Sequence, residues 1–487
     1  MISIFLNKAF YDKIAVKTEQ GRQYSYRDLR ILSSHICNHI QFSSLIFCLC
    51  KNDLGALVGY LAFVGHNIPA VMIDCQKGKD IIDNLISVYQ PRYLWMPAER
   101  KHEFGGNIIK EVLGYVLIER EAKPYEIHPD VALLLTTSGS TGSPKLVKLT
   151  KENIISNARS IAQYLGITSS ERPITSLPMY YSFGLSVINS HLIKGATILL
   201  TDKGVMQKEF WNFAKDAEAT SISGVPYTYE MLKRLRFFRM ELPKLKTLTQ
   251  AGGKLNSSLA KEFIENSRAC NKRFIVMYGQ TEATARMSYL PEDVAAEKCT
   301  SIGIAIPGGN FTIIDSYGNE ISDAEIDGEL VYTGPNVSMG YAECIADLAR
   351  GDENHGVLHT GDIARRDSDG YYYITGRMKR FVKVWGNRCN LDAIEDMLKS
   401  SVIIRQTTGN DSNSINGEKL SSNLAVTGID DKITVFTTQK NFDTEIKTFL
   451  AEKTGLNTRA FSVKEIDYIP KNTSGKILYA ELQKLLD

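Results

Sequence analysis

The stretch TTSGSTGSPK, residues 136–145, crowds hydroxyl side chains, two glycines, a proline and a lysine into ten consecutive positions. It follows the apolar run VALLL (131–135) and runs into KLVKL (145–149), and both runs are typical of short strands. Glycines let backbone N–H groups approach a ligand, while hydroxyls and a lysine add donors, so the loop suits a phosphate chain. Its spacing differs from GxxxxGK[ST], and a solvated turn is the alternative that the loop alone leaves open.

A helix is predicted after this loop. Apolar residues recur at helical spacing from Ile154 to Leu165. Thr150 is suited to cap the start of the helix, and Gly166 is suited to end it. The sequence therefore predicts a strand, the hydroxyl-rich loop, a second strand and a helix in that order.

The pattern of predicted secondary structure changes twice along the chain. Strand-like and helix-like segments alternate through the first 300 residues, which indicates α/β layers. From about 301 to 374, short alternating runs and glycine turns predict hairpins of a small β-barrel or sheet. The last hundred residues contain helix and strand patterns sufficient for a small α+β domain, and residues 407–422 resemble a long mobile loop.

Composition excludes several classes of protein. A chain of 487 residues with 43% hydrophobic and 23% charged residues is globular and too long for one core. A net charge of +2 gives no reason to expect nucleic acid. The eight cysteines form no CxxC pair and are interpreted as small buried residues in a reducing compartment. With neither a signal peptide nor a clean apolar stretch of about 20 residues, we expect a cytoplasmic protein without a membrane span.

Further motifs follow the hydroxyl-rich loop. They are YGQTEAT (278–284), GELVYTGPNVSMGY (328–341), HTGD (359–362), GRMKRFVKVWGNRCNLDAIE (376–395) and PKNTSGK (470–476). Together with the loop, these motifs and their order resemble the adenylate-forming superfamily of AMP-binding enzymes, which includes acyl-CoA synthetases, peptide-synthetase adenylation domains and luciferases. The six motifs cover most of the chain.

The resemblance implies a fold and two domains. We expect an α/β fold with a large N-terminal region, made of two α/β sheet-and-helix subdomains plus a small β-barrel-like subdomain, followed by a small mobile α+β C-terminal domain. Residues 1–376 would form the N-terminal AMP-binding domain. Residues 377–487 would form a lid that carries the catalytic lysine.

The resemblance also implies an ATP site. In it, Thr281 donates to the α-phosphate and Glu282 holds Mg²⁺, a hard ion that prefers carboxylate and phosphate oxygens. Asp362 and Arg377 contact the ribose, whose two hydroxyls a carboxylate can accept. The remaining residues expected to bind ATP or AMP are Thr137, Ser138, Gly139, Ser140, Thr141, Gly142, Lys145, Gly252, Gly253, Tyr278, Gly279 and Gln280.

Three residues of the C-terminal region complete the expected machinery. Lys476 in PKNTSGK is the implied catalytic lysine, whose ammonium would bridge the acid and the α-phosphate. Lys379 in GRMK lies at the implied hinge, and Gly386 would line the channel for pantetheine. Charge alone equally allows residues 379–383 to be a solvated basic linker.

Two segments depart from the family pattern. LPMYYSFGL (177–185) has Tyr181 where many acyl-CoA ligases carry histidine, and its lack of a charge disfavours an α-amino acid. Tyr181 and Phe183 are expected in the substrate pocket, and with Tyr180 they suggest an apolar acyl or aryl group. After NLDAIEDML the family's usual pattern is hard to find, so CoA and a carrier-protein phosphopantetheine stay level as acceptors.

The resemblance implies an AMP-forming acid–thiol ligase. ATP would activate a small-molecule carboxylic acid as an acyl-adenylate, releasing pyrophosphate, and the acyl group would pass to the phosphopantetheine thiol of CoA or of an acyl carrier protein. Two alternatives stay open. One is adenylation without thioester formation, and the other is a catalytically silent nucleotide-binding partner protein.

Overall fold

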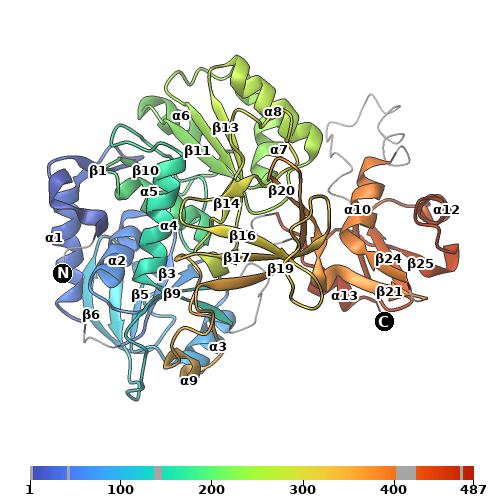
Figure 1. Cartoon of the computed structure of the whole chain (residues 1–487). Coiled ribbons are helices and arrows are strands. Elements are labelled where there is room, and N and C mark those ends of the chain that lie inside the picture. Colours follow the sequence, from blue (N-terminus) through green and yellow to red (C-terminus); the bar gives the residue numbers. More distant parts are fainter. Residues whose placement is uncertain are drawn as a thin grey trace. The chain divides into compact units, whose positions relative to one another are not determined.

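The computed structural model describes residues 4–40, 44–136, 145–385, 387–401, 424–471 and 475–486. The chain divides into two compact units, of which the first contains residues 1–311 and 331–358 and the second residues 312–330 and 359–487. The predicted division at 376/377 stays a prediction. Figure 1 traces the elements along the chain.

The first unit contains a mixed sheet of eight strands. Its strand order is β18 (Tyr341–Ala342), β9 (Leu146–Thr150), β8 (Val131–Thr136), β4 (Ala70–Asp74), β3 (Ile46–Cys50), β5 (Tyr93–Pro97), β7 (Tyr115–Glu119) and β6 (Asn107–Val112). Its helices are α1 (Tyr26–Cys37), α2 (Leu54–Gly65), α3 (Lys79–Tyr89) and the short α9 (Ile345–Leu348). The strands β8, β4, β3 and β5 pair in parallel and are almost wholly apolar, as expected for strands covered on both faces.

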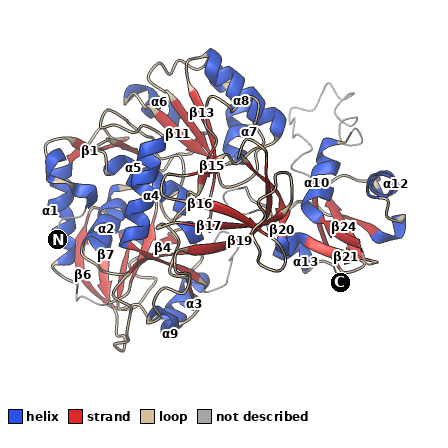
Figure 2. Ribbon diagram, in the orientation of Figure 1, coloured by secondary structure: helices blue, strands red, loops and turns tan. Residues whose placement is uncertain are grey.

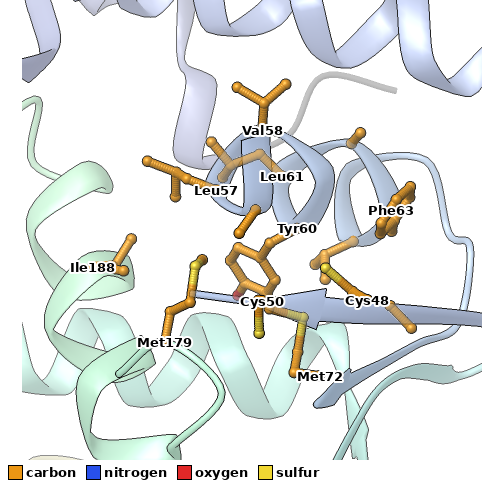
Figure 3. Packing of buried hydrophobic residues seen from close by; sticks show 14 of the residues in the cluster. Cys48, Cys50, Leu57, Val58, Tyr60, Leu61, Phe63, Met72, Met179 and Ile188 are labelled. Atoms are coloured by element: carbon orange, nitrogen blue, oxygen red, sulfur yellow. The ribbon is translucent and has the colours of Figure 1, made fainter. Parts of the chain in front are cut away.

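Helix α2 has no polar face because it is packed on every side. All its residues from Gly55 to Gly65 are buried. Figure 3 shows Tyr60 of this helix pointing toward Cys50 of β3, with Ile188 nearby. The hydroxyl of Tyr60 donates a 3.0 Å hydrogen bond to Oδ1 of Asn189, which links helix α2 to helix α5 (Ser182–Leu192).

A second sheet of five strands has the order β11 (Ser221–Gly224), β12 (Thr247–Gln250), β13 (Arg273–Tyr278), β14 (Ser288–Tyr289) and β15 (Ile304–Ala305). The helices that accompany it are α4 (Lys151–Tyr164), α5 (Ser182–Leu192), α6 (Lys208–Asp216), α7 (Pro226–Arg234) and α8 (Ser257–Ala269). Figure 2 shows α8 running alongside β13. Because β11, β12 and β13 are parallel, their carboxyl ends meet at one edge, where ligands bind in open α/β sheets. A three-stranded sheet of β10 (Ile198–Leu200), β1 (Ile14–Thr18) and β2 (Gln23–Ser25) completes the unit.

The second unit contains most of a four-stranded sheet and a small α+β domain. The four strands are β16 (Asn310–Ile314), β17 (Gly328–Thr333), β19 (Val357–Arg366) and β20 (Tyr372–Arg377), and a turn at Asp369 and Gly370 joins the last two. The α+β domain contains β21 (Phe381–Val384), β22 (Asn387–Asn390), α10 (Leu391–Ser400), β23 (Leu424–Ile429), β24 (Lys432–Thr437), α12 (Asp443–Thr454), β25 (Phe461–Glu465) and α13 (Tyr479–Gln483).

The fold class predicted from the sequence is confirmed, while the mobility of the C-terminal domain stays a prediction. The predicted strands and helix around the hydroxyl-rich loop are also confirmed. Strands β8 and β9 flank the loop, the Thr150 side chain caps α4, and Gly166 follows that helix at a φ of +65°. The predicted loop at 407–422 lies outside the described residues. Among the described helices, none has the length and hydropathy needed to cross a bilayer.

The prediction that the cysteines are buried is wrong for part of the set. Cys37, Cys48 and Cys50 are buried in the core of the first unit, but Cys270 and Cys344 are exposed. Cys270 follows the end of α8 and Cys344 precedes α9, and residues at helix ends are commonly solvated.

Candidate active site

The phosphate-loop residues from Thr137 to Gly142 lie outside the described residues, so their predicted role stays a prediction. The structure does place the two ends of that loop. Strand β8 ends at Thr136, and Lys145 directly precedes β9, which pairs antiparallel with β8.

Lys145 and Glu282 are brought to the two sides of one tyrosine. The Lys145 ammonium lies 3.7 Å from the centre of the Tyr341 ring, and the Tyr341 hydroxyl donates a 2.8 Å hydrogen bond to Oε1 of Glu282. Burial, and after it the charge of Glu282, raises the pKa of Tyr341, which keeps the hydroxyl protonated as a donor. Tyr341 was quoted only as the end of a motif, so its role was missed.

The backbone of the YGQTEAT segment is held in a strained turn. Thr281–Ala283 form a single 3-10 turn after β13, and Thr284 and Ala285 adopt positive φ values of 57° and 107°. A side chain at Gly279 would overlap the backbone of Ala285, so only glycine fits there.

The 331–358 segment fixes this turn. The side-chain amide of Asn336 donates a 2.8 Å hydrogen bond to the carbonyl of Ala283. The backbone carbonyl of Asn336 accepts a 2.7 Å hydrogen bond from the Thr284 hydroxyl. The backbone N–H of Ser338 donates a 2.8 Å bond to the carbonyl of Glu282. These contacts hold the Glu282 backbone in position, and the residue as a whole is half-buried.

The predicted substrate residues lie beside this turn. The hydroxyls of Ser182 and Thr281 are 3.1 Å apart, which places the start of α5 against the predicted α-phosphate donor. Gly252 has a φ of +83°, and a Cβ there would approach the Tyr181 hydroxyl to 2.6 Å. Tyr181, Gly252 and Thr281 are therefore brought together at the carboxyl edge of the second sheet.

The other predicted nucleotide residues of this edge lie close by in sequence and structure. Gly253 follows β12, whereas Tyr278 ends β13. The Gln280 amide donates a 3.2 Å hydrogen bond to the Tyr278 hydroxyl, and the Tyr278 ring lies 6.4 Å from that of Phe311. Tyr278 and Gln280 thus contact each other, and Tyr278 also lies near Phe311.

In the second unit, Asp362 and Arg377 face each other across β19 and β20. Their Oδ1 and Nε atoms are 3.1 Å apart, with the Asp362 side chain 4% and the Arg377 side chain 52% exposed. Asp362 lies within β19, where Gly361 at a φ of +68° precedes an irregularity in the pairing with β20.

The structure describes the C-terminal candidates in part. Lys379 lies in the 3-10 turn Met378–Arg380, and nothing is described of its side chain, while Gly386 lies outside the described residues. Lys476 is half-buried and lies shortly after residues 472–474, which are outside the described residues. Their predicted roles stay predictions.

The alternative of a solvated linker does not hold at Arg380, which is 8% exposed. Its guanidinium lies 2.7 Å from Asp392 and 3.2 Å from Glu395, and it stacks 3.7 Å from the Tyr479 ring. The Tyr479 hydroxyl donates to Glu395 at 2.9 Å. This network joins the residue after Lys379 to the helix that follows Lys476.

A cavity of about 110 Å³ lies between α5 and the second sheet. Tyr181 and Phe183 are not among its lining residues, but the Phe183 ring lies 4.4 Å from the guanidinium carbon of Arg286, which does line it. Sequence reasoning missed Arg286, although an arginine four positions after Glu282 was a visible signal. In the part of the chain that the structure describes, three or more metal-ligating side chains nowhere gather.

Comparison with known proteins agrees with this arrangement. The model of the family "AMP-binding enzyme" matches residues 7–342, and the chain belongs to this family.

Three similar proteins illustrate the range of the likeness. A feruloyl-CoA synthase from Amycolatopsis is 30% identical over 277 residues, which are 55% of this chain and 54% of that protein. A D-alanine–D-alanyl carrier protein ligase from Streptococcus agalactiae is 25% identical over 406 residues, 79% of each chain. The structure of O-succinylbenzoate coenzyme A synthetase from Bacillus subtilis with ATP and magnesium has a TM-score of 0.77 and 20% identity, covering 99% of both chains. The chain thus spans about half the length of the first of these relatives, and the solved structure shows a shared fold.

Proposed function

We propose that this protein is an AMP-forming acid–thiol ligase. A carboxylate oxygen attacks the α-phosphorus of ATP and pyrophosphate leaves. A thiol sulfur then attacks the acyl carbon, and AMP leaves as the thioester forms. The single observation that carries the proposal is the turn at Thr281 and Glu282, fixed by Asn336 and Ser338, within a match to the AMP-binding family.

The proposed roles follow the chemistry of the side chains. Glu282 offers a carboxylate oxygen that is oriented by Tyr341, a donor that fits Mg²⁺ bound to phosphate oxygens. Thr281 donates to the α-phosphate, and the residues of the 136–145 loop with Lys145 hold the other phosphates. Asp362 and Arg377 hold the ribose, and Lys476 neutralises charge where the two anions meet.

The acceptor is the phosphopantetheine thiol of CoA or of an acyl carrier protein. The two curated relatives support one acceptor each, because one is named a CoA synthase and the other a carrier protein ligase. Gly386 is proposed to line the thiol channel and Lys379 to act as the hinge. The proposed location is the cytoplasm.

Acid-dependent ATP–pyrophosphate exchange tests the first step. The purified protein is given a panel of carboxylic acids, with Glu282→Gln as the matched inactive control. Exchange that depends on the acid and is lost in the control supports the proposal. Silence with every acid contradicts it and favours a nucleotide-binding partner protein.

Thiol capture tests the second step. The acid that supports exchange is offered with CoA and, separately, with a pantetheinylated carrier protein. Formation of either thioester supports the ligase, and exchange without any thioester favours the adenylate-only alternative.

A further inference from the structure

Arg286 is a buried cation that lacks an ion-pair partner. Its exposure is 1%, and among the described residues no carboxylate oxygen lies within 4.0 Å of its guanidinium. One terminal nitrogen lies 2.6 Å from Sδ of Met277 and 3.1 Å from the Tyr164 hydroxyl. The buried Nε atom has no hydrogen-bond partner at all.

Such an arrangement is unfavourable for folding alone. Burying a charge without a countercharge is costly, and neutral contacts with a thioether, a phenol and the Phe183 face offset only part of that cost. A methionine or leucine would fill the same space without this penalty. We infer that Arg286 is present for a ligand.

Arg286 belongs to the lining of a cavity that has both polar and apolar residues around it. The polar residues of that lining include Ser190 of α5, Ser223 of β11 and Thr249 of β12. His191 on α5 also lines it, with Nδ1 2.8 Å from the carbonyl of Val187, so that Nδ1 carries the proton and Nε2 is left as an acceptor.

Three further titratable side chains line the cavity, namely Glu171, Lys246 and Arg273. Arg273 is paired with Glu292 at 2.8 Å. Burial first, and the charge of Arg286 in addition, lower the pKa of His191 to about 4, so this imidazole is neutral near pH 7. Arg286 is therefore the buried cation without a carboxylate partner in this lining.

The cavity borders the amino-terminal residues of β11, β12 and β13, among them Thr247 and Arg273, and helix α5 connects it to the proposed reaction centre. Ser182 contacts Thr281 at 3.1 Å, and the next residue, Phe183, stacks on Arg286. Val187, Ser190 and His191 continue along α5 on the face that borders the cavity. An acid whose reacting carboxylate lies at Thr281 can thus extend along α5 toward Arg286.

We propose that the cavity receives the far end of the substrate acid, and that Arg286 binds a second carboxylate there. This proposal rests on the proposed function and names its substrate class as short dicarboxylic acids. The size of the cavity, about 110 Å³, supports a short chain. An engineered cavity of roughly 150 Å³ binds benzene, so the smaller cavity here suits a group no larger than a short chain end.

The test compares acids that differ only at the far end. Exchange is measured with succinate against butanoate, glutarate against pentanoate, and adipate against hexanoate. For at least one pair, we expect kcat/KM of the wild-type protein to favour the dicarboxylate by about 10²-fold or more, because a buried polar group rejects a ligand that leaves it unpaired.

Variants assign this preference to Arg286. Arg286→Met is expected to lose the preference for the dicarboxylate while retaining exchange with the monocarboxylate. Arg286→Lys is expected to retain part of the preference. The control Arg268→Gln, at an exposed position of α8, is expected to leave the preference unchanged. A folded Arg286→Met protein with the wild-type ratio would overturn the proposal. If that variant does not fold, the wild-type ratio decides alone.

Failure of the two proposals looks different. Exchange with monocarboxylates and none with dicarboxylates overturns the substrate class but leaves the ligase standing. If none of the six acids supports exchange, and no other acid of the panel does either, the result counts against the ligase itself. It then counts against this inference as well.

Discussion

The Tyr341 hydroxyl lies 2.8 Å from Oε1 of Glu282, and these residues are separated by a long stretch of chain and belong to different motifs. Tyr341 begins β18, which pairs with β9, so the strand that follows the phosphate loop fixes the group that orients the proposed magnesium ligand. Strand β9 and the Glu282 carboxylate are therefore linked through the side chain of Tyr341.

Tyr341→Phe removes this hydrogen bond and retains the ring. We expect the Mg²⁺ concentration for half-maximal exchange to rise by about tenfold, the usual effect of losing a group that orients a ligating side chain. A magnesium titration of exchange checks this. Tyr317→Phe is the matched control, since Tyr317 is 88% exposed. An unchanged titration would show that Glu282 needs no orientation by Tyr341.

Asp362→Asn removes the charge that is proposed to accept the ribose hydroxyls. Hydrogen bonds to a charged group contribute about 1.5–3 kcal/mol, so KM for ATP should rise by about 10-fold or more. KM for the acid should change little. Asp323→Asn, on an exposed turn of the same unit, is the control. Equal changes in both KM values would argue against a ribose contact.

Glu395→Gln tests the buried network beside the predicted hinge. Glu395 is 4% exposed and accepts from Arg380, Lys399 and Tyr479. Breaking a buried ion pair costs about 3–5 kcal/mol, so we expect a clear drop in the melting temperature of the C-terminal region. Differential scanning calorimetry measures it, with exposed Glu445→Gln as the control. A loss within the error of the control would mean that the network is not stabilising.

His191 predicts a loss of stability in acid. Burial lowers its pKa from 6.5 to about 4, so the folded state resists protonation that the unfolded state accepts. The stabilisation is complete above pH 6.5 and is lost as the pH falls toward 4, by roughly 3 kcal/mol in all. Denaturant unfolding of wild type and His191→Gln between pH 7 and 4 should show a shallower pH slope in the variant. Parallel slopes would contradict the assignment.

The elements around the phosphate loop were predictable because their signals are local. The cap at Thr150 and the glycine at 166 depend on neighbouring residues alone, and so do the strands on either side of the loop. The family resemblance added the residues at 278–282, whose contacts the structure then supplied.

Arg286 and Arg380 show what local signals leave out. Arg286 is buried by Tyr164, Phe183 and Met277, which come from three separate elements, and Arg380 by partners on α10 and α13. Periodicity describes one element at a time, so an arginine in either place resembles an ordinary charged residue. The expectation of an apolar acyl or aryl group depends on Tyr180, Tyr181 and Phe183 alone and leaves out the cation that stacks on Phe183.

Lys476→Ala provides the most direct test, because a ligase with two half-reactions requires this lysine in only one of them. Adenylate formation, measured by pyrophosphate exchange, should fall by about 10² to 10³-fold. Consumption of a pre-made acyl-adenylate by the thiol should continue near the wild-type rate, and exposed Lys484→Ala should affect neither reaction. Equal loss of both half-reactions in a protein with unchanged melting behaviour would contradict the account.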